Sequence, residues 1–253
     1  MKAPAFSSLN RFNLVMAFLH AVQGVVVVLL SRDFSLPIST SYLAFNEATQ
    51  TLDPATSEVF NLSVPWLIAG FFFLSALFHL VIATTYRKTY EKNLELGMNK
   101  ARWYEYSISA SVMLVAISLL VGIYDLSSLI MIFVLASGMN LMGLVMEVHN
   151  QTTKTTDWLS YWIGCLLGAI PWVAIAIYLW SGAANGSAAP TFVYWIFVSM
   201  FVFFNLFAIN MWLQYKGIGS WKSYLYGERA YIILSLVAKS LLAWQVFAGT
   251  LRP

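Results

Sequence analysis

The sequence predicts an all-α membrane protein, in which seven transmembrane helices form one bundle and a single domain over residues 1–253. Three observations support this prediction. First, 60% of the residues are hydrophobic and only 10% are charged, whereas soluble domains carry about 25% charged residues. Second, the apolar residues gather in long runs, and a helix needs roughly 20 such residues to cross the bilayer core. Third, backbone groups in lipid must bond internally, so apolar runs of this length are expected to be helices.

Each element follows from a feature of the chain. The first apolar run, from Leu14 to Leu30, lacks a small-residue cleavage site, so it is predicted to be a signal anchor and the first membrane helix. Segment 31–60 is the one long connection, and it is predicted to be an extracellular loop with a small hairpin around Leu36–Phe45. The helices are predicted at residues 9–30, 61–85, 100–123, 127–149, 158–180, 191–215 and 225–250.

Basic residues predict how the bundle is oriented. Eleven of the 14 lysines and arginines fall on one side of the predicted helices, and such an excess marks the cytoplasmic side. The N-terminus is therefore predicted to be cytoplasmic and the C-terminus extracellular, in a multi-pass protein of the plasma membrane. The net charge of +3 is too small to suggest a nucleic-acid partner. The cytoplasmic set is Lys2, Arg11, Arg87, Lys88, Lys92, Lys100, Arg102, Lys154, Lys216, Lys222 and Arg229, and the extracellular set is Arg32 and Arg252.

Lys239 is the outstanding ionisable residue, because an uncompensated charge deep in a membrane helix is costly and indicates function. It lies ten residues beyond Arg229 in a stretch with no other charge. At 1.5 Å per residue this places it roughly 15 Å into the bilayer. One interpretation is a structural lysine paired with a carboxylate. The other is a desolvated amine that forms a Schiff base with a carbonyl ligand, because burial favours the neutral, nucleophilic amine.

A positive charge at Lys239 would need a counterion, and Glu105 is the candidate near the start of the third helix. An ion pair between Glu105 and Arg102 is the alternative. His20 and His79 lie in the cytoplasmic halves of the first two helices, and Ser75 shares a face with His79 because it lies one turn away. These residues are either hydrogen-bonded core residues or part of a polar pocket with Glu105.

Several segments together resemble one family of retinal proteins. Ser235-Leu-Val-Ala-Lys239-Ser resembles the helix 7 attachment motif of microbial rhodopsins, and Arg102-Trp-Tyr-Glu105 resembles their helix 3 counterion motif. The predicted inverted topology is the mark of the heliorhodopsins. Four further segments resemble that family: Leu74-Ser-Ala-Leu-Phe-His79, Glu105-Tyr-Ser-Ile-Ser-Ala-Ser-Val-Met113, Gln214-Tyr-Lys-Gly217 and Gly227-Glu-Arg-Ala-Tyr231. The resemblance covers nearly the whole chain.

The resemblance implies a rhodopsin-like bundle in which Lys239 binds all-trans retinal and Glu105 is the counterion. Ser235 would replace the second carboxylate that pumps hold at its position, while Ser109 would lie near the chromophore. His20, His79 and Ser75 would line a polar cavity on the cytoplasmic side. Aromatic walls confine such a ligand, and Trp172 and Phe204 are the candidates. A cytoplasmic polar network would be formed by Arg102, Glu147, Tyr224 and Glu228.

The residues argue against ion pumping. Pumps of the resembling group place a proton donor eleven residues after the counterion, and Ala116 occupies that position here. The leading hypothesis is therefore a photoreceptor, which the resemblance implies to be a homodimer with a cytoplasmic signalling partner. Light-gated proton or ion conduction is the second hypothesis, and a non-photoactive seven-helix receptor or transporter is the third. No motif typical of an enzyme is visible.

Overall fold

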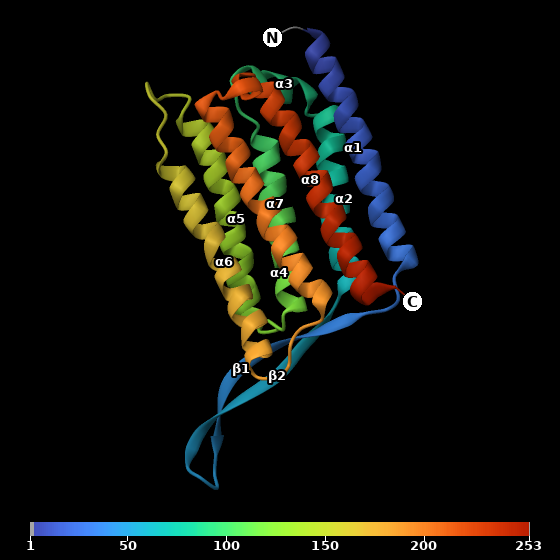
Figure 1. Ribbon diagram of the computed structural model, residues 1–253, viewed down its shortest axis with the longest axis vertical. Helices are drawn as coiled ribbons and strands as arrows, with labels where there is room; N and C mark the ends of the chain where they lie inside the picture. The colour runs from blue at the N-terminus through green and yellow to red at the C-terminus, as the bar shows by residue number, and fades with distance from the viewer. Residues whose placement is uncertain (1–2, 253) are drawn as a thin grey trace.

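The structure is a computed structural model that describes residues 3–252. Within that range, seven helices are long and apolar enough to cross a membrane, as the sequence predicted. Figure 1 shows them side by side, with a β-hairpin extending from one end of the bundle. The seven helices are α1 (Ala3–Leu30), α2 (Val64–Ala83), α4 (Lys100–Leu120), α5 (Leu126–His149), α6 (Leu159–Ala184), α7 (Thr191–Lys216) and α8 (Tyr224–Val246), and one further turn, η2, covers Phe247–Leu251.

Polar caps and special backbone residues set the helix ends. Asn99 precedes α4, and its side chain accepts a hydrogen bond from the Arg102 backbone N–H. Asp125 caps α5 in the same way through Ser128. Such caps bind backbone donors that the first helical turn leaves free. Gly217 ends α7 in the left-handed conformation, with φ of 61°, which glycine adopts without steric cost. The predicted second helix, 61–85, was too long because residues 61–63 belong to a strand.

The hairpin is larger than the small one predicted around Leu36–Phe45. Strand β1 (Ser35–Asn46) pairs antiparallel with β2 (Thr51–Ser63), with one irregularity between Ile38 and Ser39. The hairpin is held against the bundle because the Ser39 N–H donates to the Tyr124 carbonyl at 2.9 Å and Ile38 is 1% exposed. It therefore covers the end of the bundle where α4 turns into α5 (Figure 1).

The connection predicted between the second and third membrane helices contains a short helix, α3 (Arg87–Glu95), that was not predicted from the sequence. Its Tyr90 and Leu94 are buried one turn apart, while Lys88 and Lys92 are exposed. The helix therefore packs one apolar stripe across the end of the bundle and leaves its charges outside. A further short helix, η1 (Gly219–Lys222), joins α7 to α8.

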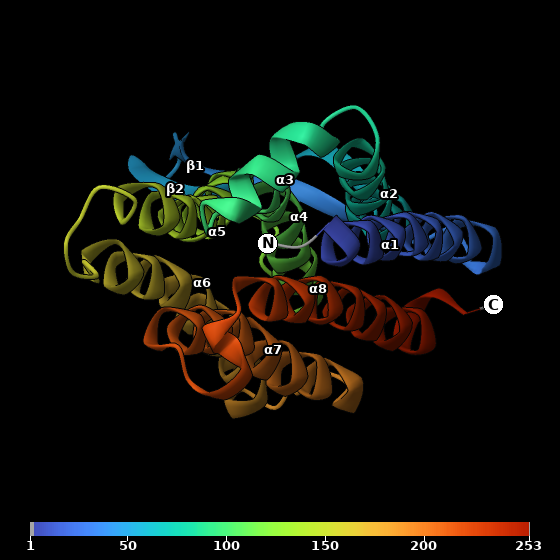
Figure 2. The same ribbon diagram turned by 90° about the horizontal axis from the view of Figure 1, so that it is seen from above.

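Figures 1 and 2 show that α3 and the N-terminus lie at one end of the bundle, which we call the α3 end. The hairpin lies at the other end, the hairpin end. Because Arg11 and α3 lie at the α3 end and Arg32 at the hairpin end, the two predicted sets of basic residues are separated. Lys2 lies outside the described residues. Which end faces the cytoplasm stays a prediction.

The interior differs between the two ends. Helix α4 is the most enclosed of the spans, with 67% of its apolar window buried, and neighbouring helices surround it in Figure 2. Around its second half the core is apolar and includes Ile38, Phe72, Ile117 and Leu242. The buried charged side chains lie nearer the α3 end or at mid-depth. This division of apolar and charged groups determines where the candidate site lies.

Candidate functional site

Lys239 lies at mid-depth in α8 and is 3% exposed. Its Nζ donates to Glu105 Oε1 at 3.2 Å and to Ser235 Oγ at 2.8 Å. Ser235 is one turn earlier in α8, which places the two side chains on the same face. The Nζ also lies 5.4 Å from the centre of the Tyr106 ring. The lysine is therefore held in a fixed position by a carboxylate, a hydroxyl and an aromatic face.

Glu105 comes from α4 and is 5% exposed. The oxygen that contacts Lys239 also contacts Ser75 Oγ of α2 at 2.6 Å. Ser75 is in addition 2.9 Å from the Phe71 carbonyl, one turn earlier in its own helix. Two donors from different helices therefore meet at Glu105 Oε1. The ion pair of Glu105 is with Lys239, so the alternative pairing of Glu105 with Arg102 is wrong.

Arg102 is instead the centre of a second buried cluster, between Glu147 of α5 and Glu228 of α8. One guanidinium nitrogen lies 2.5 Å from Glu147 Oε1, and the other is hydrogen-bonded to Glu228 Oε2. The Tyr224 hydroxyl contacts Glu147 Oε1 at 3.0 Å. The Arg102 Cζ also lies 4.0 Å from the centre of the Tyr231 ring. All four residues of the predicted polar network are therefore in contact.

The two histidines form a stacked pair beside these charges. The rings of His20 and His79 are 5.6 Å apart and nearly parallel. His79 Nδ1 lies 2.8 Å from Asn13 Oδ1, whereas both ring nitrogens of His20 are buried without a hydrogen-bond partner among the described residues. The pair thus offers unused nitrogen atoms next to the Lys239 site.

A small cavity of about 20 Å³, lined largely by polar and charged side chains, lies between Glu105 and the α3 end. His79 and Glu105 line it, but His20 and Ser75 do not, so the prediction that all three of His20, His79 and Ser75 would line such a cavity was wrong for two of them. Ser75 faces Glu105 instead, and His20 packs against His79 and Phe72. The cavity walls are Asn13, Phe78, His79, Ile82, Asn99, Arg102, Glu105, Tyr106, Glu228 and Ile232.

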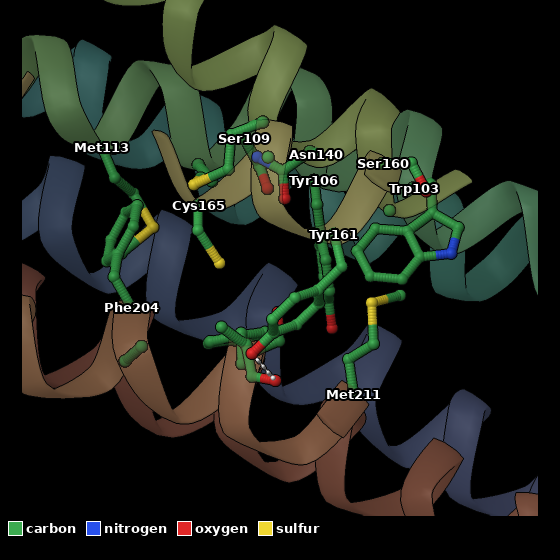
Figure 3. A pocket seen from close by; sticks show the side chains of 18 of the residues that line it. Trp103, Tyr106, Ser109, Met113, Asn140, Ser160, Tyr161, Cys165, Phe204 and Met211 are labelled. Atoms are coloured by element: carbon green, nitrogen blue, oxygen red, sulfur yellow. Dashed lines mark hydrogen bonds between the residues drawn. The ribbon is translucent and has the colours of Figure 1, made fainter. Parts of the chain in front are cut away.

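A larger and mainly apolar cavity begins at Lys239 and extends between α4, α5, α6 and α7. Its volume is about 110 Å³. Figure 3 shows Tyr106 and Met113 of α4, Tyr161 of α6 and Phe204 of α7 around this space. Ser109, Asn140 and Ser160 are among the few polar residues in its walls. An apolar cavity with one amine at its end fits an elongated apolar ligand with one reactive group.

The sequence matches the family model described as heliorhodopsin over residues 9–251. The chain belongs to the heliorhodopsin family. The fold is shared with a light-driven proton pump from Leptosphaeria maculans, at a TM-score of 0.67 and 13% identity over 98% of this chain and 95% of that one. It is also shared with cyanorhodopsin from the cyanobacterium Tolypothrix sp. NIES-4075, at a TM-score of 0.61 and 16% identity over 99% and 96% of the two chains. No curated protein sequence matches the chain.

Membership of the heliorhodopsin family implies a retinal chromophore, and the large cavity fits one. Lys239 supplies the amine, and the aromatic and methionine side chains supply apolar walls for a polyene. The Ser109 hydroxyl is 0% exposed and has no partner among the described residues. Ser109 lies in the cavity wall, so a molecule in the cavity would lie beside it. The residues present therefore suit retinal.

Of the two aromatic residues predicted to line the retinal pocket, one lies in the wall of the large cavity. Phe204 lines the cavity, as expected, but Trp172 does not. Trp172 packs edge-on against Phe204 at 5.4 Å between ring centres, and against Phe197 and Phe201. It therefore supports the wall from behind. The sequence could not reveal this, because a tryptophan in a membrane helix gives no sign of which neighbour its ring faces.

Sequence reasoning missed most of the cavity walls. Met113, Met139, Asn140, Phe207 and Met211 line the space, but apolar residues at helical spacing are expected anywhere in a membrane bundle. Tyr106 could have been predicted as a cavity residue, because it directly follows Glu105 and carries a hydroxyl. That hydroxyl donates to the Tyr231 carbonyl at 3.0 Å, which fixes the ring beside Lys239.

Proposed function

We propose that this heliorhodopsin is a light-sensing photoreceptor that signals and does not pump ions, with all-trans retinal bound at Lys239 and Glu105 as counterion. The observation that carries the proposal is the unequal distribution of polar groups on the two sides of Lys239. Toward the α3 end lie Glu105, the histidine pair and a polar cavity. Toward the hairpin end, the described core is apolar.

When bound, retinal supplies the absorption of visible light and a change of shape. The chain's own groups then decide where a proton from the Lys239 nitrogen goes. Glu105 Oε1 lies 3.2 Å from that nitrogen and can accept the proton, while Ser75 and Ser235 orient the pair. The polar cavity continues from Glu105 toward Arg102 and Glu228. A proton received there can be held and returned from the same side.

Pumping needs a titratable group on the far side of the lysine, and the described residues offer none in the expected place. Ala116, at the position of a pump's donor, is buried within the apolar part of α4. Ile117 and Leu114 beside it are 0% exposed. In α8, Gln245 lies beyond Lys239, where its Oε1 contacts Ser199 Oγ at 3.2 Å. These groups do not exchange protons at physiological pH.

The proposal includes an orientation and partners. Basic residues at the α3 end favour that end as cytoplasmic, so the N-terminus would be inside and the hairpin outside the plasma membrane. A homodimer and a cytoplasmic signalling partner follow from the family resemblance. The all-trans form of the retinal is likewise taken from the family resemblance. The α3 end would carry the signal, because the charged groups nearest Lys239 continue in that direction.

Illumination of cells that express the protein tests the proposal. External pH is recorded with and without a protonophore, and photocurrent is measured under voltage clamp, with Lys239→Ala as control. We expect light-induced absorption changes without a sustained pH change or a steady current. A pH change that the protonophore abolishes would indicate a pump, and a current that reverses with voltage would indicate a channel. Either result would overturn the sensory proposal.

A further inference from the structure

Five charged side chains are buried among the residues that the structure describes: Arg102, Glu105, Glu147, Glu228 and Lys239. Lys239 is paired with Glu105, and Arg102 is shared between Glu147 and Glu228. One carboxylate charge is therefore left without a cation. An uncompensated charge inside a membrane protein costs several kcal/mol, so the site favours the binding of one more positive charge.

The two carboxyls that share Arg102 differ in the donors they receive. Glu147 Oε1 accepts from Arg102 and Tyr224, and Glu147 Oε2 accepts from the Asn99 backbone N–H and the Trp103 indole N–H at 2.8 and 2.7 Å. The guanidinium, the backbone N–H and the indole can only donate. A proton on Glu147 Oε2 would therefore displace a donor. On Oε1 only the Tyr224 hydroxyl could reverse its bond, and that hydroxyl already accepts from Arg102 at 3.4 Å.

Glu228 can accommodate a proton. Its Oε2 accepts from Arg102, and its Oε1 accepts from Asn99 Nδ2 at 2.8 Å and the Tyr90 hydroxyl at 2.9 Å. A phenolic hydroxyl both donates and accepts, so the bond between Tyr90 and Glu228 can reverse. The Asn13 side chain lies beside the Tyr90 hydroxyl.

Access also differs between the two carboxyls. Glu228 and Glu105 line the same polar cavity, whereas Glu147 does not. The charged and titratable groups around Glu228 come from several helices and would respond to its charge. They are His79 of α2, Tyr90 of α3, Arg102, Glu105 and Tyr106 of α4, Glu147 of α5, and Tyr224 and Tyr231 of α8.

We propose that Glu228 is a proton-binding site that holds one exchangeable proton in the dark. The proton comes from water at the α3 end and forms an O–H bond at Oε1, and no electrons are transferred. This O–H donates to the Tyr90 oxygen, and the Tyr90 hydroxyl turns away from the carboxyl. Asn13 lies beside Tyr90, and its Oδ1 contacts His79 Nδ1 at 2.8 Å, so polar contacts connect Glu228 with the histidine pair.

Infrared spectroscopy of the full-length protein, kept in the dark, tests this inference. Spectra at mildly acid and mildly alkaline pH are subtracted, because exposed carboxyls titrate near about pH 4 and stay ionised throughout. We expect a carbonyl band of a protonated carboxyl on the acid side. Glu228→Gln should lose this band at every pH. Glu147→Gln also removes the excess negative charge, so it should keep the band but at a lower pH, and Lys239→Ala should keep it. The absence of the band in the unmodified protein, or its loss at every pH in Glu147→Gln and not in Glu228→Gln, would overturn the inference.

Two further variants keep the test decisive where Glu228→Gln does not fold. Tyr90→Phe keeps every charge and removes the proposed acceptor, so the band should move to higher frequency, and an unshifted band would contradict the assignment. Glu105→Gln removes the excess negative charge, so the band should appear only at lower pH. The measurement needs neither visible illumination nor the chromophore. Because Lys239→Ala should keep the band, a failure of the Glu228 proposal can be distinguished from a failure of the proposed photoreceptor function.

Discussion

Ser75 Oγ lies 2.6 Å from Glu105 Oε1, the same oxygen that accepts the hydrogen bond from Lys239. The two residues are 30 positions apart in the sequence and come from α2 and α4. The contact orients the carboxylate so that one oxygen serves both the hydroxyl and the amine. The electrostatic environment of Lys239 therefore depends on three helices, α2, α4 and α8.

Glu105→Gln is expected to move the visible absorption of the retinal-loaded protein to longer wavelength. A carboxylate next to the protonated lysine nitrogen stabilises the positive charge, and the amide removes that stabilisation. The visible form should therefore be lost at a pH lower by roughly one to three units. Absorption spectra across a pH titration measure both effects. An unchanged spectrum and titration would rule out Glu105 as the counterion.

Ser75→Ala is expected to give a smaller change in the same measurement. The substitution keeps the carboxylate charge but removes a donor, and a hydrogen bond to a charged group contributes about 1.5–3 kcal/mol. Ser107→Ala is a matched control, because Ser107 Oγ bonds only the Tyr104 carbonyl in the described structure, at 2.8 Å. Equal spectra for Ser75→Ala and the unmodified protein would mean that the contact does not tune the site.

Gly143→Ala is expected to destabilise the protein by about 1–3 kcal/mol, the usual cost of overpacking. A methyl group at Gly143 would lie 2.5 Å from the Trp103 ring, whose indole N–H is bonded to Glu147 at 2.7 Å. Both residues line the large cavity, so binding of retinal should weaken as well. Gly70→Ala, where no atom lies within 4 Å, should leave stability unchanged or raise it by up to about 1 kcal/mol.

Thermal loss of the visible band measures these two glycine variants side by side. The packing argument requires the Gly143 variant to lose the band at a clearly lower temperature than the Gly70 variant. Similar midpoints for both would mean that the Trp103 ring can move aside without cost.

Asp125→Ala is expected to cost about 1 kcal/mol at neutral pH, the typical contribution of a helix N-cap. The Ser127 hydroxyl, followed by the Ser128 backbone N–H, holds the pKa of Asp125 below its ordinary value of 3.8. A lowered pKa in the folded state means that this stabilisation is present above 3.8 and is lost as the pH falls through the folded-state pKa. Unfolding temperatures of both proteins, measured at neutral pH and in strong acid, should therefore converge in acid. A constant difference would show that the cap does not depend on the carboxylate charge.

Hydropathy was sufficient for the transmembrane helices, because the bilayer imposes one length and one backbone geometry on every span. Predicted and observed bounds mostly differ by a few residues, as at α5, predicted at 127–149 and found at Leu126–His149. The elements outside the membrane were harder to predict. Helix α3 is only nine residues long, so its apolar pattern is short. Strand β2 contains Pro54, a residue that argues against a strand in sequence-based prediction.

The buried charges could be singled out from the sequence, but spacing alone left the partner of Glu105 open between Lys239 and Arg102, and the family resemblance supplied Lys239. Arg102 and Glu105 lie one turn apart in α4, and that spacing suggested a pair. Arg102 and Glu105 instead pair with residues of other helices. Arg102 lies between Glu147 of α5 and Glu228 of α8, and Glu105 pairs with Lys239 of α8. Pairing across helices depends on their rotation and depth, which local sequence does not encode. The same reason explains why Trp172 was placed in the cavity wall.

The most direct test of the account is whether Lys239 carries the chromophore. The protein, its Lys239→Ala variant and a Ser235→Ala variant are each purified with all-trans retinal, and their visible absorption is recorded. Lys239 is the buried lysine of the described structure and lines the large cavity. We therefore predict a visible band in the unmodified protein and in Ser235→Ala, and none in Lys239→Ala. A visible band that survives in Lys239→Ala would contradict the assignment of this lysine as the attachment site.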